Sequence, residues 1–269
     1  MLKKLIPICL LVMLMVACSK EIIESKQESV VEETANNDGA PNNQDLLFEE
    51  LDRELKSTME NVHDSRGVFD VGFPLNQWDF VGSTYTLCLD AANRLSLNKE
   101  GEVNIESVKE YFNTVNQHWL TIIPGQDQFK TENNINQFEL DILEKYNDII
   151  EEVNNSTAHI LISKVFERFV IRNVSDEQRQ QRLLVYMSLY RHTISFFHTN
   201  GVIVNGNQIF NDVDGVGTIS PQLKAVHECM HGYAVDHNWG NLEWYGWSLA
   251  PTVCMSIVAA ECIAEVYNL

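Results

Sequence analysis

Two histidines and a glutamate near the end of the chain have the residue types and the spacing that metal chemistry requires. They lie in the stretch His227-Glu228-Cys229-Met230-His231. Residues four apart on a helix share one face, so the imidazoles of His227 and His231 can reach the same metal ion. The carboxylate of Glu228 can then act as a base toward a water molecule on that ion. The spacing predicts a Zn²⁺ site in which His227 and His231 are ligands and Glu228 is the catalytic residue.

The sequence around this motif favours the helix that such a site needs. Ser220 and Pro221 precede the motif, and they are typical of a helix N-cap and of a first helical position. No proline interrupts the following residues, most of which are uncharged. We therefore expect a helix over residues 221–234.

The motif resembles the H-E-x-x-H signature of zinc metallopeptidases, the zincins, which implies a third protein ligand and a water in the fourth position. A gluzincin-like arrangement would use Glu261, which lies 30 residues after His231 and is followed by Ala264 and a further acid. A metzincin-like arrangement would use His237 instead. Ala234 stands where metzincins have a glycine that turns the chain out of the helix, which favours Glu261 over His237.

The same resemblance implies a mechanism. Zinc lowers the pKa of its bound water toward neutrality and polarises the carbonyl group of a peptide or protein substrate. Glu228 would accept the proton of that water and return it to the leaving amine. The function expected from the motif is that of a zinc-dependent peptidase.

A second resemblance implies a different function. A helical middle part, a tyrosine-containing helix and an apolar C-terminal segment rich in small residues follow one another along the chain. This layout resembles that of a group of Gram-negative envelope lipoproteins. It implies a non-catalytic helical surface lipoprotein with a binding or structural role, in which His227 and His231 are ordinary hydrogen-bonded side chains.

The N-terminus has the features of a lipoprotein signal peptide. Lys3 and Lys4 precede an apolar stretch over residues 5–16, and the sequence M-V-A-C that ends at Cys18 resembles the lipobox, which is cut before its cysteine. We expect residues 1–17 to be removed. Cys18 would then carry the lipid that anchors the chain to the outer membrane of the cell envelope.

The segment after the lipidation site is predicted to be a flexible acidic tether over residues 18–45, because it is polar and contains glycine, proline and several asparagines. Removal of the signal peptide takes away Lys3 and Lys4 and lowers the formal net charge from −19 to −21. So acidic a surface repels nucleic acid. The predicted partners are therefore the membrane, through Cys18, and a peptide or protein substrate.

Residues 46–269 are predicted to form a single, mainly helical domain with the metal site at 221–269. Ser175 to Gln178 have the pattern of a capping box. The apolar spacing predicts helices over residues 46–62, 84–95, 107–123, 136–153, 157–170, 176–198 and 256–266. Asn205-Gly206 between two apolar runs predicts a β-hairpin, so the expected fold class is mainly α with a small hairpin.

The remaining cysteines and histidines are predicted to serve the core or the surface. An oxidising envelope permits disulfides among Cys88, Cys229, Cys254 and Cys262, in three possible pairings, but their apolar neighbours favour free buried thiols. Five histidines lack the spacing of metal ligands and are expected to be surface or hydrogen-bonded core residues: His63, His118, His159, His192 and His198.

Overall fold

The computed structural model describes residues 43–62, 70–122, 136–209, 219–236 and 251–269, with side chains at all of them except 61–62, 231–236 and 251–255. Most of these residues are helical. The helices are α2 (Asn43–Val62), α3 (Asp79–Ser96), α4 (Ile105–Ile122), α5 (Gln137–Glu152), α6 (Ser156–Asn173), α7 (Glu177–Asn200), α8 (Pro221–Asp236) and α10 (Pro251–Tyr267), and the strands are β1 (Ile203–Val204) and β2 (Asn207–Gln208). The predicted fold class, mainly α with a small β-hairpin, is confirmed.

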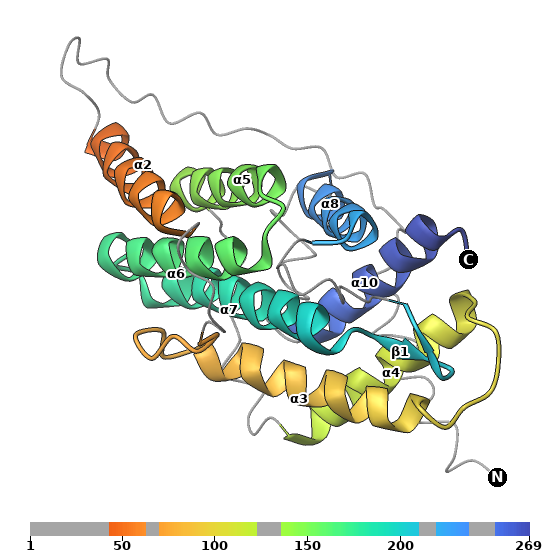
Figure 1. Ribbon diagram of the computed structural model, residues 1–269. Helices are drawn as coiled ribbons and strands as arrows, with labels where there is room; N and C mark the ends of the chain where they lie inside the picture. The colour runs from red at the N-terminus through yellow and green to blue at the C-terminus, as the bar shows by residue number, and fades with distance from the viewer. Residues whose placement is uncertain (1–42, 63–69, 123–135, 210–218, 237–250) are drawn as a thin grey trace, which may run out of the picture.

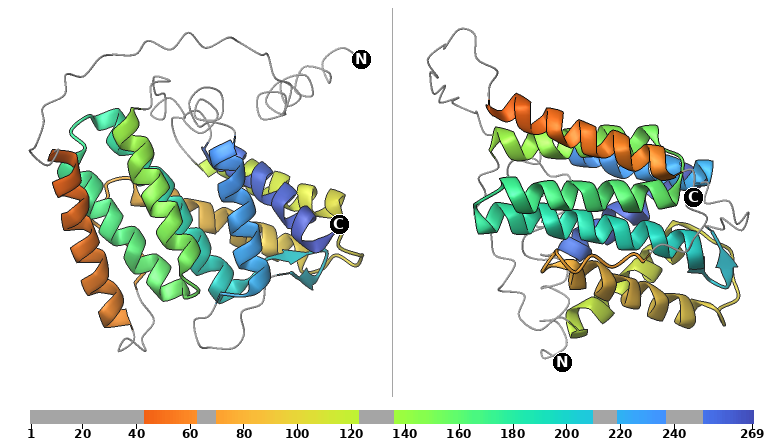
Figure 2. Two further views of the ribbon diagram at one scale, coloured as in Figure 1. Left: turned by 90° about the horizontal axis from the view of Figure 1, so that it is seen from above. Right: turned by 60° about the vertical axis from the view of Figure 1, so that its left-hand side comes forward.

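The helices α6 and α7 lie side by side in the middle of the domain (Figure 1). α3 packs against α7 and also contacts α4, while α2 packs along α6. α10 contacts both α4 and α8. Turned views show α2, α5, α6 and α7 as neighbouring rods, with α8 and α10 toward one end (Figure 2). Within the described residues, no helix is long and apolar enough to cross a membrane.

Short polar side chains set where several helices begin. Asn136 and Glu139 form a reciprocal capping box at the start of α5, in which each side chain accepts a hydrogen bond from the backbone N–H of the other residue. At the start of α7 the cap is Asp176, whose carboxylate accepts from the Arg179 N–H. The N-cap is thus Asp176 and not Ser175, and the reciprocal capping box predicted over Ser175 to Gln178 is wrong because Arg179 stands where a box needs Glu or Gln.

The helix α7 is buried on every side, because consecutive residues along most of its length are buried. Such a helix cannot keep its polar side chains in water. Arg191 and His192 lie in its buried stretch, and both have to find partners inside the protein.

The β-hairpin forms where the sequence predicted it. Asn205 and Gly206 have φ angles of 48° and 75°, the left-handed conformation that a tight hairpin turn of this kind requires. Asn93 of α3 holds the strand by accepting a hydrogen bond from the Ile203 N–H and donating one to the Gly201 carbonyl. The hairpin is thereby fixed to the body of the domain just before α8.

Candidate functional site

The H-E-x-x-H motif lies on one continuous helix, α8, as its spacing requires. The Ser220 hydroxyl accepts a hydrogen bond from the Leu223 N–H at 3.1 Å, and Pro221 is the first helical residue. The predicted cap and the predicted helix are both confirmed. Leu223 and Val226 are buried in the core, so one face of α8 is fixed against the domain.

His227 points from this buried face toward α6 and α7. Its ring packs edge to face against Tyr190, with 4.6 Å between the ring centroids, and the centroid of His159 is 6.4 Å away. Aromatic pairs at such distances stabilise a fold by about 1 kcal/mol beyond the area they bury. The first histidine of the motif is therefore part of an aromatic cluster.

Hydrogen bonds fix the tautomer of His159 and occupy the hydroxyl of Tyr190, the two aromatic neighbours of His227. Nε2 of His159 lies 2.6 Å from the carbonyl oxygen of Val153, so Nε2 carries the hydrogen and donates it. Nδ1 then accepts from the Tyr190 hydroxyl at 2.5 Å. Burial lowers the pKa of His159 to about 4, although the bond to Val153 opposes the shift. His159 is thus a neutral core residue, as the sequence predicted.

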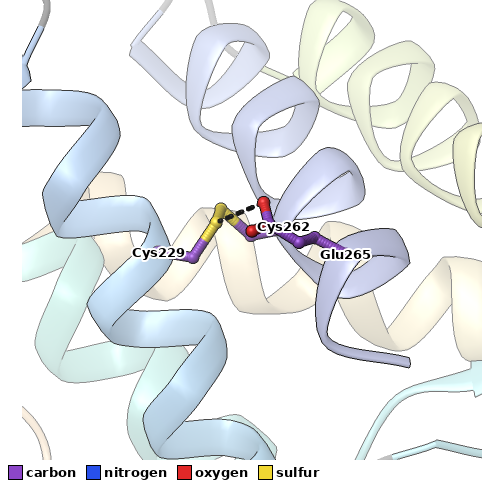
Figure 3. The surroundings of a disulfide bond; sticks show 3 residues. All are labelled: Cys229, Cys262 and Glu265. Carbon is purple, nitrogen blue, oxygen red and sulfur yellow. Dashed lines mark hydrogen bonds between the residues drawn. A yellow bond between two sulfur atoms is a disulfide. The ribbon is translucent and has the colours of Figure 1, made fainter. Parts of the chain in front are cut away.

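Cys229 points to the other side of α8 and forms a disulfide with Cys262 of α10 (Figure 3). The free buried thiols predicted at these two positions are therefore wrong. The prediction failed because it relied on the apolar neighbours, whereas the packing of α8 on α10 brings the two Cα atoms within 5.7 Å. Cys88 is buried and free, as predicted, and the side chain of Cys254 lies outside the described ones.

Glu228, the predicted catalytic base, faces the solvent. Half of its side chain is exposed, and the nearest charged partner is Lys224, one turn earlier on α8, at 3.8 Å. An exposed pair of this kind contributes little to stability. The carboxylate is accessible, but the structure places a lysine beside it.

The predicted third ligand, Glu261, is an exposed residue of α10. Residues two apart on a helix are about 200° apart around its axis, so Cys229 and His227 leave α8 on nearly opposite sides. The disulfide fixes α10, and Glu261 with it, on the Cys229 side. The backbone of His231 lies in α8, whereas its side chain, all of His237 and the predicted lipidation site Cys18 lie outside what the structure describes.

The donor types of the predicted site suit zinc, because two imidazoles and a carboxylate form a common ligand set. Among the side chains described, no three of His, Cys, Asp and Glu are grouped so that they could hold a metal ion. His231 and His237 are outside that set. The described residues therefore show the helix of the motif, and the side chains of two of its four candidate ligands lie outside them.

A second group of ionisable side chains comes together in the core, and the sequence analysis missed it. Arg191 of α7 is completely buried and donates to both carboxylate oxygens of Glu167 in α6, at 3.1 and 3.0 Å. It also donates to Oδ1 of Asp79 in α3 at 2.5 Å. Because a buried charge is costly unless it is paired, these carboxylates permit Arg191 to lie in the core.

His192 and Asn76 complete this core cluster. Nε2 of His192 donates to Oδ1 of Asp79 at 3.0 Å, and Nδ2 of Asn76 donates to Glu167 at 2.7 Å. Burial works against ionisation of Asp79, but hydrogen bonds from His192 and from a backbone amide, together with the charge of Arg191, hold the pKa of this carboxyl below its usual range. The cluster joins α3, α6 and α7 as a structural clamp.

A close approach of α3 to α7 accompanies the clamp. A Cβ atom at Gly82 would lie only 2.4 Å from the backbone oxygen of Ser188. The Gly82 N–H donates to the Ser188 hydroxyl at 3.3 Å. Asn76, Asp79 and Gly82 are spaced three apart, but no local pattern in the sequence indicates that Asn76 and Asp79 meet Glu167 and Arg191.

The structure thus defines a mainly helical domain with a core ion-pair cluster and a disulfide within the H-E-x-x-H helix. Comparisons of the chain with protein-family models, with curated proteins and with solved structures find no match.

Proposed function

We propose that this chain is a lipid-anchored protein of the cell envelope, attached at Cys18 to the outer membrane, with a non-catalytic binding or structural role. The basic, apolar and lipobox segments of the N-terminus support the anchor. The observation that supports the non-catalytic role is the packing of His227 against Tyr190. In this proposal α8 is a structural helix that joins α6 and α7 on one side to α10 on the other.

Two substitutions of one residue test whether His227 serves packing. His227→Ala removes the ring and is expected to lower the free energy of unfolding by about 1 to 2 kcal/mol. His227→Phe keeps an aromatic ring against Tyr190 and is expected to stay within about 0.5 kcal/mol of the parent chain. Urea unfolding measures both. If Phe is as damaging as Ala, the ring nitrogens contribute more than the packing, and the packing role assigned to His227 is wrong.

A second candidate function is a zinc-dependent peptidase, which is supported by the position of the whole motif on one capped helix. His227 and His231 would hold Zn²⁺ with Glu261, or alternatively His237, as the third ligand. Bound zinc would supply an acidified water and a polarised substrate carbonyl. Glu228 would take up the proton of the water and deliver it to the leaving amine.

A peptide-cleavage assay tests this second candidate. Glu228→Gln removes the base while keeping the size of the side chain, so it should abolish cleavage by an active peptidase, by a factor of about 100 or more. Glu265→Gln, an exposed acid on α10, is the matched control and should leave cleavage unchanged. Cleavage that Glu228→Gln does not reduce would come from a contaminant.

A further inference from the structure

The two sulfurs of the disulfide differ in their access to solvent. Cys262 is completely buried, at 0% exposure, whereas Cys229 lies at the partly exposed surface of α8. A thiolate opens a disulfide by attacking one of its sulfurs, and access decides which one. Of the two cysteines, Cys229 is therefore the one that an external thiol can approach.

A carboxylate lies beside the sulfur that can be attacked. Oε2 of Glu265, an exposed residue of α10, is 3.8 Å from Sγ of Cys229 (Figure 3). Glu265 comes three residues after Cys262, so both leave α10 on the same side. A disulfide sulfur carries no hydrogen to donate, so this contact places a negative charge against the electrophilic sulfur.

We propose that Cys229 is the site at which small thiols modify this protein, and that Glu265 protects it by repelling them. The thiolate of the reagent bonds to Sγ of Cys229 as the S–S bond breaks. The electron pair of that bond goes to Sγ of Cys262, which leaves as a thiolate and takes a proton from water. The product is a mixed disulfide on Cys229, and a second reagent thiolate completes the reduction by attacking the sulfur bound to Cys229.

Opening the disulfide changes how α8 is held. With the S–S bond intact, α8 is covalently joined to α10 across 33 residues of sequence. Once the bond is open, α8 is held by non-covalent packing alone, including Leu223 and Val226 in the core and His227 against Tyr190. Glu265 thus controls how readily a thiol can break the covalent link between α8 and α10.

The test compares two thiols of different charge on the mature chain. Glutathione is an anionic reagent, whereas the thiolate of cysteamine is balanced by its ammonium group. The repulsion between two unit negative charges about 4 Å apart in water slows a reaction roughly fivefold, and salt weakens this repulsion. Glu265→Gln is expected to speed opening by glutathione roughly threefold and opening by cysteamine much less. Glu177→Gln, an exposed acid at the start of α7, is the matched control and should change neither rate.

Two further readouts separate charge from simple loosening of the structure. Added salt should speed the reaction of glutathione with the parent chain more than with Glu265→Gln. Mass spectrometry of the trapped adduct should place glutathione on Cys229. Equal acceleration of both thiols by Glu265→Gln, no acceleration at all, or an adduct on Cys262 would each overturn the proposal.

Discussion

At the scale of single residues, the main feature of this protein is a guanidinium group in the core. Arg191 has 0% exposure and is paired with Glu167, whose side chain is also at 0%. A buried pair adds little net stability, but removal of one partner leaves the other charged and desolvated. Loss of either Arg191 or Glu167 is therefore expected to destabilise the fold, because the other side chain would stay buried without its partner.

This dependence predicts the cost of breaking the pair. Arg191→Met should lower the free energy of unfolding by about 3 to 5 kcal/mol, because it leaves Glu167 without its cation. Lys99→Met, which breaks the exposed pair of Lys99 with Glu110, is the matched control and should cost at most about 1 kcal/mol. Urea unfolding measures both changes. Similar losses for the two variants would contradict a clamp role for Arg191.

His159 predicts how stability depends on pH. The pKa of His159 is about 4 in the folded protein, below the ordinary value of 6.5. Between pH 6.5 and 4, His159 binds a proton in the unfolded chain but not in the folded chain, so the stability of the fold decreases as the pH falls through this range. The total loss from this residue is about 3 kcal/mol.

A comparison with His159→Gln isolates that contribution, since glutamine does not titrate. The difference in unfolding free energy between the parent chain and this variant should shrink by about 3 kcal/mol from pH 7 to pH 4. Asp79, with its lowered pKa, acts in a separate window, because the stability it contributes is lost only below its ordinary value of 3.8. A difference that stays constant with pH would show that His159 is not held neutral.

At the scale of helices and strands, the sequence predicted most of the elements because the signals are local. Apolar spacing identified the helices, and Asn205-Gly206 identified the hairpin. The starts of α3 and α10 were exceptions, since these helices begin at Asp79 and Pro251 and not at residues 84 and 256. Asp79 and Gly82 contact α7, and no local pattern reports that contact.

The core cluster of Asp79, Glu167 and Arg191 could not be predicted from the sequence for the same reason. Asp79, Glu167 and Arg191 lie far apart along the chain and meet only when α3, α6 and α7 pack together. The pairing of Cys229 with Cys262 likewise depends on how α8 meets α10. The predicted metal site differs from the core cluster in one respect. Its H-E-x-x-H motif is local and could be found in the sequence, whereas its predicted third ligand requires a tertiary contact.

The close contact of α3 with α7 predicts the effect of one added methyl group. Gly82→Ala would place a Cβ 2.4 Å from the Ser188 backbone oxygen, so the two helices would have to move apart. The expected loss in unfolding free energy is about 2 kcal/mol. Gly101→Ala is the control, because the nearest atom to its Cβ is 3.5 Å away, and it should be nearly neutral. Equal stability of the two variants would mean that α3 does not approach α7 so closely.

At the scale of the whole molecule, the first helix that the structure describes, α2, begins at Asn43, slightly before the predicted domain boundary at residue 46. The proposed anchor precedes it, in the part of the chain that the structure does not describe. In the proposed arrangement the lipid on Cys18 holds an acidic helical domain at the membrane surface. Within the domain, the core cluster connects α3, α6 and α7, and the disulfide connects α8 to α10.

The anchor makes a prediction about where the chain is found. Cys18→Ala removes the lipidated residue and should shift the protein from the membrane fraction to the soluble fraction or leave the signal peptide uncut. Cys9→Ala, in the apolar part of the same signal peptide, is the matched control and should leave fractionation unchanged. Radiolabelled palmitate should be incorporated by the control and not by Cys18→Ala. Labelling that survives in Cys18→Ala would contradict the anchor.

The zinc content of the purified mature chain, measured beside the His227→Phe variant, tests the central claim most directly. If α8 is a structural helix with His227 packed on Tyr190, neither protein should contain zinc in proportion to the chain, and both should be folded. About one zinc per parent chain, lost in His227→Phe, would contradict the claim and establish the motif as a metal site.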